Sequence, residues 1–266
     1  MRRPILLAAM LCAPAHVAGQ AIDVTRYRII DLTHPFNGQT LYWPNAPSTF
    51  KLERLAYGPS AGGYFYSAFA YSAPEHGGTH LDAPIHFSAT GNTADQIPLS
   101  QLVAPAVVID ITATAAKDPD FLLSAADVLA FERAHGRIRP GTIVLLRTGW
   151  SKRWPDRKSY LGDDTPGDAS HLHFPSFGAD AARLLVEQRR IAALGADVAS
   201  IDYGASTDFI VHRIATGANV PGLENLTNLD QLPARGATIF ALPMKIEGGS
   251  GGPLRAIALV PRKGDQ

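Results

Sequence analysis

Apolar residues along the chain form two patterns that predict strands. The segments 26–34 (RYRIIDLTH) and 64–73 (YFYSAFAYSA) are rich in β-branched and aromatic residues and are bounded by proline or glycine, which is typical of strands. The segments 106–111 (AVVIDI) and 142–148 (TIVLLRT) are almost continuously apolar. Such runs indicate strands that are covered on both faces.

Two helices are predicted between these strands. Ser124 is followed three residues later by Asp127, which resembles a capping box, and Gly136 provides a stop. A second helix is predicted over 179–190, with its pair of leucines facing the core.

Two further strands are expected after the second helix, over 196–204 and 237–246. Strands separated by helices occur beside strands that could pair directly, which predicts an α/β fold with a mixed, barrel-like sheet and surrounding helices. No repeat, low-complexity run or long linker divides residues 22–266. We therefore expect them to form a single domain.

The first 21 residues have the layout of a secretory signal peptide. Arg2 and Arg3 precede an apolar stretch that ends in small residues, so cleavage and a periplasmic or secreted protein are expected. An uncleaved membrane anchor is the alternative. Pro4 and Pro14 make this stretch a poor membrane-spanning helix.

Composition limits the kinds of molecule that the protein is expected to bind. The chain is 46% hydrophobic and 18% charged, with 24 basic and 24 acidic residues, which suits a globular domain that binds a small molecule rather than nucleic acid or a membrane. Cys12 is the only cysteine and lies in the predicted signal peptide. Any zinc site in the mature chain must therefore use histidine and carboxylate ligands.

One short motif carries most of the candidate chemistry. The sequence H-G-G-T-H-L-D-A-P-I-H places His76, His80, Asp82 and His86 within eleven residues. In an extended chain alternate residues share a face, so these side chains could converge. Two imidazoles and a carboxylate suit zinc or manganese, and this density favours a metal site over isolated polar residues.

This motif resembles H-x-G-T-H-x-D-x-P-x-H of the cyclase or kynurenine-formamidase family of metal-dependent hydrolases at every fixed position. The resemblance continues through IDLTHP, IDYGAS and NLDQLPARGA, and covers nearly all of the mature chain. The segments 118–136 and 226–236 look more like isatin hydrolases than like the compact formamidases.

The resemblance implies a site for two zinc or manganese ions per subunit. Carried over by position, the implied ligands are His76, His80, Asp82, His212 and Glu224. Asp82 and Glu224 are implied as bridging ligands, and His86 as the acid or base that moves a proton.

Without the resemblance, the two late ligands would suit other roles. His212 could lie on a helix face and pair with Asp208 at i, i+4 spacing. Glu224 follows Pro221 and Gly222 in an expected turn, where it would be a solvated charge.

Aromatic residues near the motif, or matching the family's substrate side, favour a flat aryl ring as substrate. Trp43, Phe69 and Phe174 are the predicted substrate-binding residues, and plain core packing is the alternative for each. The predicted function is hydrolysis of the C–N bond of a small aryl amide or cyclic amide, of arylformamidase or isatin hydrolase type. A homodimer or homotetramer is implied by the resemblance.

Two alternatives share the same ligands. One is a lactonase or other small-ester hydrolase, and the other is a non-catalytic periplasmic module that only binds metal. His86 separates an enzyme from such a module, because a storage site has no need for an unliganded histidine beside the metal.

Overall fold

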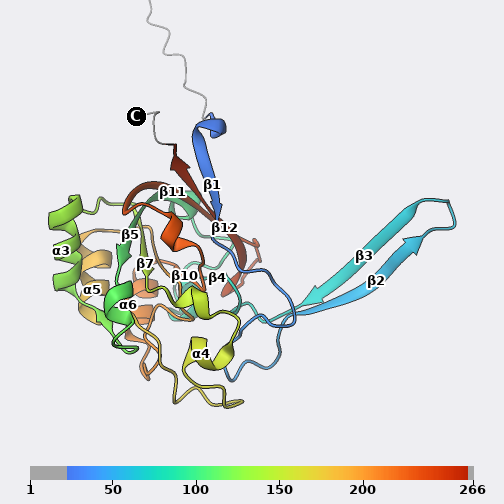
Figure 1. Cartoon of the computed structure of the whole chain (residues 1–266), viewed down its shortest axis with the longest axis horizontal. Coiled ribbons are helices and arrows are strands. Elements are labelled where there is room, and N and C mark those ends of the chain that lie inside the picture. The colour runs from blue at the N-terminus through green and yellow to red at the C-terminus, as the bar shows by residue number, and fades with distance from the viewer. Residues whose placement is uncertain (1–22, 263–266) are drawn as a thin grey trace, which may run out of the picture.

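The computed structural model describes residues 23–262, so the predicted signal peptide lies outside the described residues. Its central element is a sheet of eight strands (Figure 1). They are β1 (Tyr27–Asp31), β4 (His80–Asp82), β5 (Val103–Asp110), β7 (Ile143–Arg147), β9 (Ala193–Ala196), β10 (Gly222–Glu224), β11 (Arg235–Pro243) and β12 (Gly251–Pro261). Within residues 23–262, no helix has the length and apolar character needed to span a membrane.

The sheet is closed and mixed. Its order is β1, β12, β11, β5, β7, β9, β10, β4, and an additional pairing of β12 with β4 closes seven strands into a barrel. Three neighbouring pairs are parallel, namely β5 with β7, β7 with β9 and β9 with β10. The other pairs in the sheet are antiparallel. The predicted α/β fold with a mixed, barrel-like sheet is confirmed.

Helices cover the outside of the parallel half of the barrel (Figure 1). The longer ones are α3 (Ala125–His135), α5 (Ala179–Arg183), which continues into the π-helical turn η4 (Leu184–Gln188), and α6 (Ile210–Gly217). Shorter elements are η1 (Val24–Arg26), η2 (Pro84–His86), α1 (Leu99–Leu102), α2 (Thr112–Ala115), β6 (Leu122–Leu123), η3 (Trp150–Arg153), α4 (Arg157–Leu161), β8 (Ser176–Phe177) and η5 (Leu229–Gln231).

Local sequence explains both predicted helices. Ser124 Oγ accepts the backbone N–H of Asp127, whose carboxylate accepts the N–H of Ser124, so the predicted capping box starts α3. The helix ends where Gly136 takes a φ of +87°. In the second helix Leu184 and Leu185 are buried, as predicted.

The alternation of side chains in the strands creates two cores. In β7, Ile143 and Leu145 face the barrel interior, whereas Val144 and Leu146 pack in the other core, beneath the helices. The continuous apolar pattern of 142–148 is therefore explained by burial on both faces, as predicted.

Two segments differ from their predicted structure. The strand expected over 196–204 ends at Ala196, and an irregular loop follows. The reason is that the Asp197 carboxylate accepts the backbone N–H groups of Thr148 and Gly149 at 2.7 and 2.9 Å, which ties the chain to the end of β7. The turn expected around Glu224 is instead the buried strand β10, because its backbone pairs with β4 and β9.

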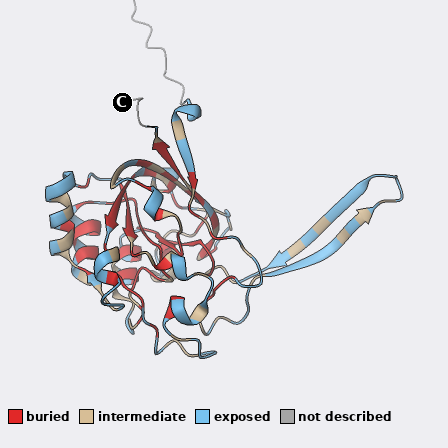
Figure 2. Cartoon of the chain, viewed as in Figure 1, coloured by how far each residue is buried: buried red, intermediate tan, exposed pale blue. Residues whose placement is uncertain are grey.

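A long two-stranded ribbon projects from the barrel (Figure 1). It consists of β2 (Lys51–Pro59) and β3 (Phe65–Ser72), paired antiparallel, and we call it the hairpin arm. Its surface is largely exposed (Figure 2). One face of the arm is mainly apolar and aromatic, and Arg54 and Ser67 also lie on it. Its exposed large apolar and aromatic members are Leu52, Tyr57, Phe65, Phe69 and Tyr71.

Candidate metal centre

The candidate ligands converge outside the barrel, between two short strands and one helix. In β4, Leu81 faces the barrel interior, so His80 and Asp82 point outward. Across the ladder, Glu224 of β10 is paired directly with His80. His212 approaches from α6, so residues far apart in sequence meet at one place.

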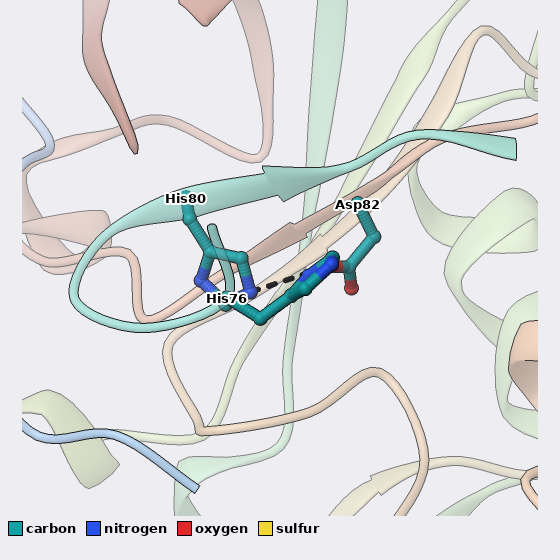
Figure 3. Close-up of side chains that lie close together, drawn as sticks. All are labelled: His76, His80 and Asp82. Carbon is teal, nitrogen blue, oxygen red and sulfur yellow. Dashed lines mark hydrogen bonds and ion pairs between the residues drawn. The ribbon is translucent and has the colours of Figure 1, made fainter. Parts of the chain in front are cut away.

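The first group of ligands is formed by the motif itself (Figure 3). Asp82 Oδ1 lies 2.6 Å from His76 Nδ1 and 3.1 Å from His80 Nε2. His80 Nδ1 lies 3.0 Å from the carbonyl oxygen of Gly78, which it can reach as a donor. That contact leaves His80 Nε2 as the nitrogen with a free lone pair toward Asp82 and the centre.

The second group shares Asp82 with the first. Asp82 Oδ2 lies 3.2 Å from His212 Nε2, and Glu224 Oε1 lies 3.2 Å from the same nitrogen. The other oxygen of Glu224 lies 3.5 Å from His80 Nε2. Each carboxylate therefore reaches both groups, which is the arrangement that two bridging ligands require.

His86 stands beside these groups but belongs to neither. It ends the 3-10 turn η2, and its ring stacks on His76 with 3.8 Å between centroids and 19° between planes. Burial lowers the pKa of His86 to about 4. Burial therefore favours the neutral form of the ring.

A cavity of about 350 Å³ opens over the ligands. His76, His80, Asp82, His86, His212 and Glu224 all line it, and its walls include Trp43, Phe87 and Phe209. Phe174 is fully buried behind Trp43, at 6.4 Å between ring centroids. Phe69 lies on the hairpin arm and is absent from the lining that the described chain provides.

Comparison with known proteins places the chain in a family. Residues 30–203 match the model of the Cyclase family. The chain belongs to the cyclase family.

Relatives of this cyclase-family protein include named hydrolases. The isatin hydrolase of Roseibium aggregatum is 40% identical over 197 residues, which cover 71% of this chain and 73% of that protein. A kynurenine formamidase of Salinibacter ruber is 30% identical over 182 residues, or 68% of this chain and 74% of that protein. Among solved structures, isatin hydrolase A from Labrenzia aggregata bound to benzyl benzoate has a TM-score of 0.82 and 34% identity, covering 91% of this chain and 96% of that chain.

The donor set of this cyclase-family site fits a divalent metal. Within each of the two groups, the imidazole nitrogens and carboxylate oxygens lie within 4.8 Å of one another, and these donors suit zinc or manganese. His80, Asp82, His212 and Glu224 are each at most 4% exposed. Buried carboxylates of this kind require a nearby positive charge.

The electrostatics agree with a cation site. Burial lowers the pKa of His80, but the charge and hydrogen bond of Asp82, together with Glu224 and the Gly78 carbonyl, outweigh it and raise that pKa to about 9. Burial and the neighbouring Asp82 raise the pKa of Glu224. The two carboxylates thus draw protons onto the imidazoles, and a bound cation would supply the positive charge in their place.

The sequence missed the residues that hold the ligands in place. His212 pairs with Asp202 at 2.7 Å, so the alternative partner Asp208 is excluded. Ser250 Oγ lies 2.9 Å from His76 Nε2. Asp202 is part of the quoted IDYGAS segment, which was the available signal for it, whereas Ser250 lies in a glycine-rich turn that gave none.

Proposed function

We propose that this cyclase-family protein is a metal-dependent hydrolase that cleaves the C–N bond of a small aryl amide or cyclic amide. One observation carries the proposal. Two groups of candidate ligands, all buried except the half-buried His76, share Asp82 at the base of an aromatic-walled cavity, and His86, which belongs to neither group, lies beside them.

The candidate ligands would bind metal, and a separate residue, His86, would transfer protons. His76, His80, Asp82, His212 and Glu224 would hold zinc or manganese, two ions per subunit. Such an ion, when bound, acts as a Lewis acid and lowers the pKa of water.

His86 supplies the proton transfer. It is the lining histidine outside both ligand groups, so its ring is free to take a proton from the attacking water and return one to the departing nitrogen. An amine leaves poorly unless it is protonated. Protonation by His86 would therefore help the C–N bond to break.

The cavity favours a planar substrate. Trp43 and the two phenylalanines give it flat apolar walls, which suit an aryl ring. Two relatives of the chain bear the names isatin hydrolase and kynurenine formamidase, and the isatin hydrolase matches at higher identity. A cyclic aryl amide is therefore the first substrate to test.

The deciding experiment compares isatin and N-formylkynurenine as substrates of the purified chain reconstituted with zinc or manganese. Turnover of either compound, lost in His86→Ala, supports the proposal and chooses the subtype. Hydrolysis of aryl lactones but not amides would instead favour the small-ester alternative. Tightly bound metal without turnover in any of these assays would favour the metal-binding module.

We also propose that the active protein is an exported homodimer or homotetramer. The arm's apolar face leaves Tyr57, Phe65 and Tyr71 more than half exposed, and an isolated two-stranded ribbon is marginally stable at best. The apolar face of the arm continues onto the barrel, where Tyr71 Oη lies 3.4 Å from Met244 Sδ. Each chain thus has an apolar face on its arm and apolar surface on the barrel at the base of the arm. Two copies related by a two-fold axis can pack the arm of one against the barrel of the other.

A further inference from the structure

Phe209 has a backbone conformation that is unfavourable for its residue type. Its φ and ψ are +50° and +43°, in the left-handed region. In the part of the chain that the structure describes, four other non-glycine residues have positive φ, and three of them are asparagines: Asn219, Asn225 and Asn228. Asparagine tolerates this region because its short side chain bonds locally, whereas phenylalanine gains no such compensation.

The fourth residue shows the ordinary use of this conformation. Arg190 follows the end of the α5–η4 helix and is exposed, and a left-handed residue at that place is a common way to end a helix. Phe209 instead precedes α6, and its side chain is partly buried. It is therefore the aromatic exception among these five residues.

The turn into α6 does not depend on the aromatic ring. The N–H of Phe209 donates to Ser206 Oγ at 3.2 Å, and Asp202 accepts the N–H groups of Val211 and His212. These bonds use the backbone of residues 209–212 and the side chains of others. Asparagine or glycine at position 209 would serve the same turn at lower conformational cost.

The ring of Phe209 lies in the wall of the cavity. Its centroid is 5.3 Å from Phe87, 6.3 Å from Trp43 and 6.2 Å from His212. All four side chains line the same cavity. The unfavourable backbone thus holds an aromatic face next to a candidate metal ligand, and strained residues of this kind gather at functional sites.

We propose that Phe209 is a specificity-determining residue that selects planar aryl substrates over saturated rings of the same size. This inference rests on the proposed hydrolase function and deepens it. A planar ring can stack on or meet the edge of Phe209 with favourable quadrupole contacts, whereas a puckered alicyclic ring cannot. The aromatic contact corresponds to about a 2- to 10-fold preference in affinity.

Two variants separate the ring from the backbone. Phe209→Asn removes the ring and suits the left-handed conformation, as at the three asparagines above. Phe209→Leu keeps an apolar side chain but removes the aromatic face. Phe131→Leu makes the same change in helix α3, outside the cavity lining, and serves as the control.

The probes are benzoate and cyclohexanecarboxylate, which share a carboxylate and a six-membered ring and differ in planarity. Their binding to the zinc-reconstituted full chain is measured by calorimetry. We expect the wild type and Phe131→Leu to prefer benzoate by about 2- to 10-fold and both Phe209 variants to lose that preference. In turnover of an aryl amide, KM should rise in both variants while kcat changes less.

Measurements of stability and turnover separate failure of the Phe209 inference from failure of the proposed hydrolase function. The melting temperature and metal content of each variant are measured as well, so that lost selectivity in a folded, metal-loaded Phe209→Asn chain is not ascribed to unfolding. Benzoate preference that is unchanged in both Phe209 variants overturns the inference, even if amides are hydrolysed. Preference lost in both variants, without amide turnover by the wild type, upholds the aryl wall while the proposed hydrolase fails.

Discussion

Asp202 and His212 are joined through a single carboxylate oxygen. Asp202 Oδ2 accepts the backbone N–H of His212 at 3.0 Å and lies 2.7 Å from its ring nitrogen Nδ1. With Nδ1 engaged in this way, Nε2 is the nitrogen turned toward Asp82 and Glu224. Asp202 thus fixes both the start of α6 and the tautomer of a candidate ligand.

Replacing Asp202 with asparagine should therefore weaken metal binding without removing a ligand. An amide nitrogen at the Oδ2 position cannot accept from His212, and loss of such a supporting contact typically costs about 10- to 100-fold in metal affinity. Competition with a chromogenic chelator measures the change. Asp208→Asn is the matched control, because Asp208 is exposed nearby and forms no hydrogen bond or ion pair with His212. Equal affinities in the two variants would contradict the assigned role.

The shared position of Asp82 predicts how many ions each variant retains. His76→Ala should lose the ion of the first group and His212→Ala that of the second, whereas Asp82→Ala should lose both. Elemental analysis after reconstitution gives the count per chain. A wild-type chain that binds a single ion, and keeps it in His212→Ala, would rule out the two-ion site.

The structural setting of the candidate ligands was only partly predictable from the sequence. The motif residues His80 and Asp82 lie on one face of a strand, as their spacing indicated, because Leu81 between them enters the barrel. Glu224 came only from the family resemblance, since its own surroundings of proline and glycine indicated a turn. The partner that makes it a strand residue is β4, which lies about 140 residues earlier in the chain.

The cavity walls were the least predictable part. Trp43 lines the cavity, but Phe174 packs behind it and Phe69 lies on the arm. Phe87 and Phe209 form the wall instead, and neither has a local pattern that distinguishes it from a core phenylalanine. Which aromatic side chains face a cavity depends on tertiary packing, which the spacing of residues does not encode.

His86→Ala should keep its metal and lose most of its turnover. The residue lies outside both ligand groups, so metal content should stay at the wild-type level. Removal of a general acid or base typically lowers kcat by about 10²- to 10⁴-fold. Steady-state kinetics and elemental analysis on the same sample test both halves. Metal loss in this variant would reassign His86 as a ligand, and normal turnover would remove it from the reaction.

His34 should make the fold less stable in mild acid. Burial lowers the pKa of His34 from 6.5 to about 4, and the ring stacks on Trp154 at 4.4 Å. The unfolded chain takes up a proton as the pH falls through 6.5, while the folded chain stays neutral until about 4. The stability that His34 contributes is therefore complete above pH 6.5 and lost between 6.5 and 4.

Urea unfolding of the metal-free wild type and His34→Phe at pH 7.5 and 4.5 measures this linkage. The variant keeps a ring against Trp154 but cannot be protonated. Relative to the variant, the wild type should lose about 1–3 kcal/mol of unfolding free energy over this range. Parallel pH dependence in the two proteins would show that another group is responsible.

The two faces of the hairpin arm allow a matched test of self-association. Phe65 lies on the apolar face with Tyr57, at 5.1 Å between ring centroids, and pairs with Pro59, whereas Tyr66 pairs with Gly58 on the opposite face. If two copies exchange apolar faces, Phe65→Asp places a charge in the contact and should shift the assembly toward monomer. Tyr66→Asp introduces the same charge on the other face and should leave the assembly unchanged. Sedimentation velocity across a concentration series reports both, and a wild-type chain that sediments as a monomer at every concentration refutes the proposed assembly.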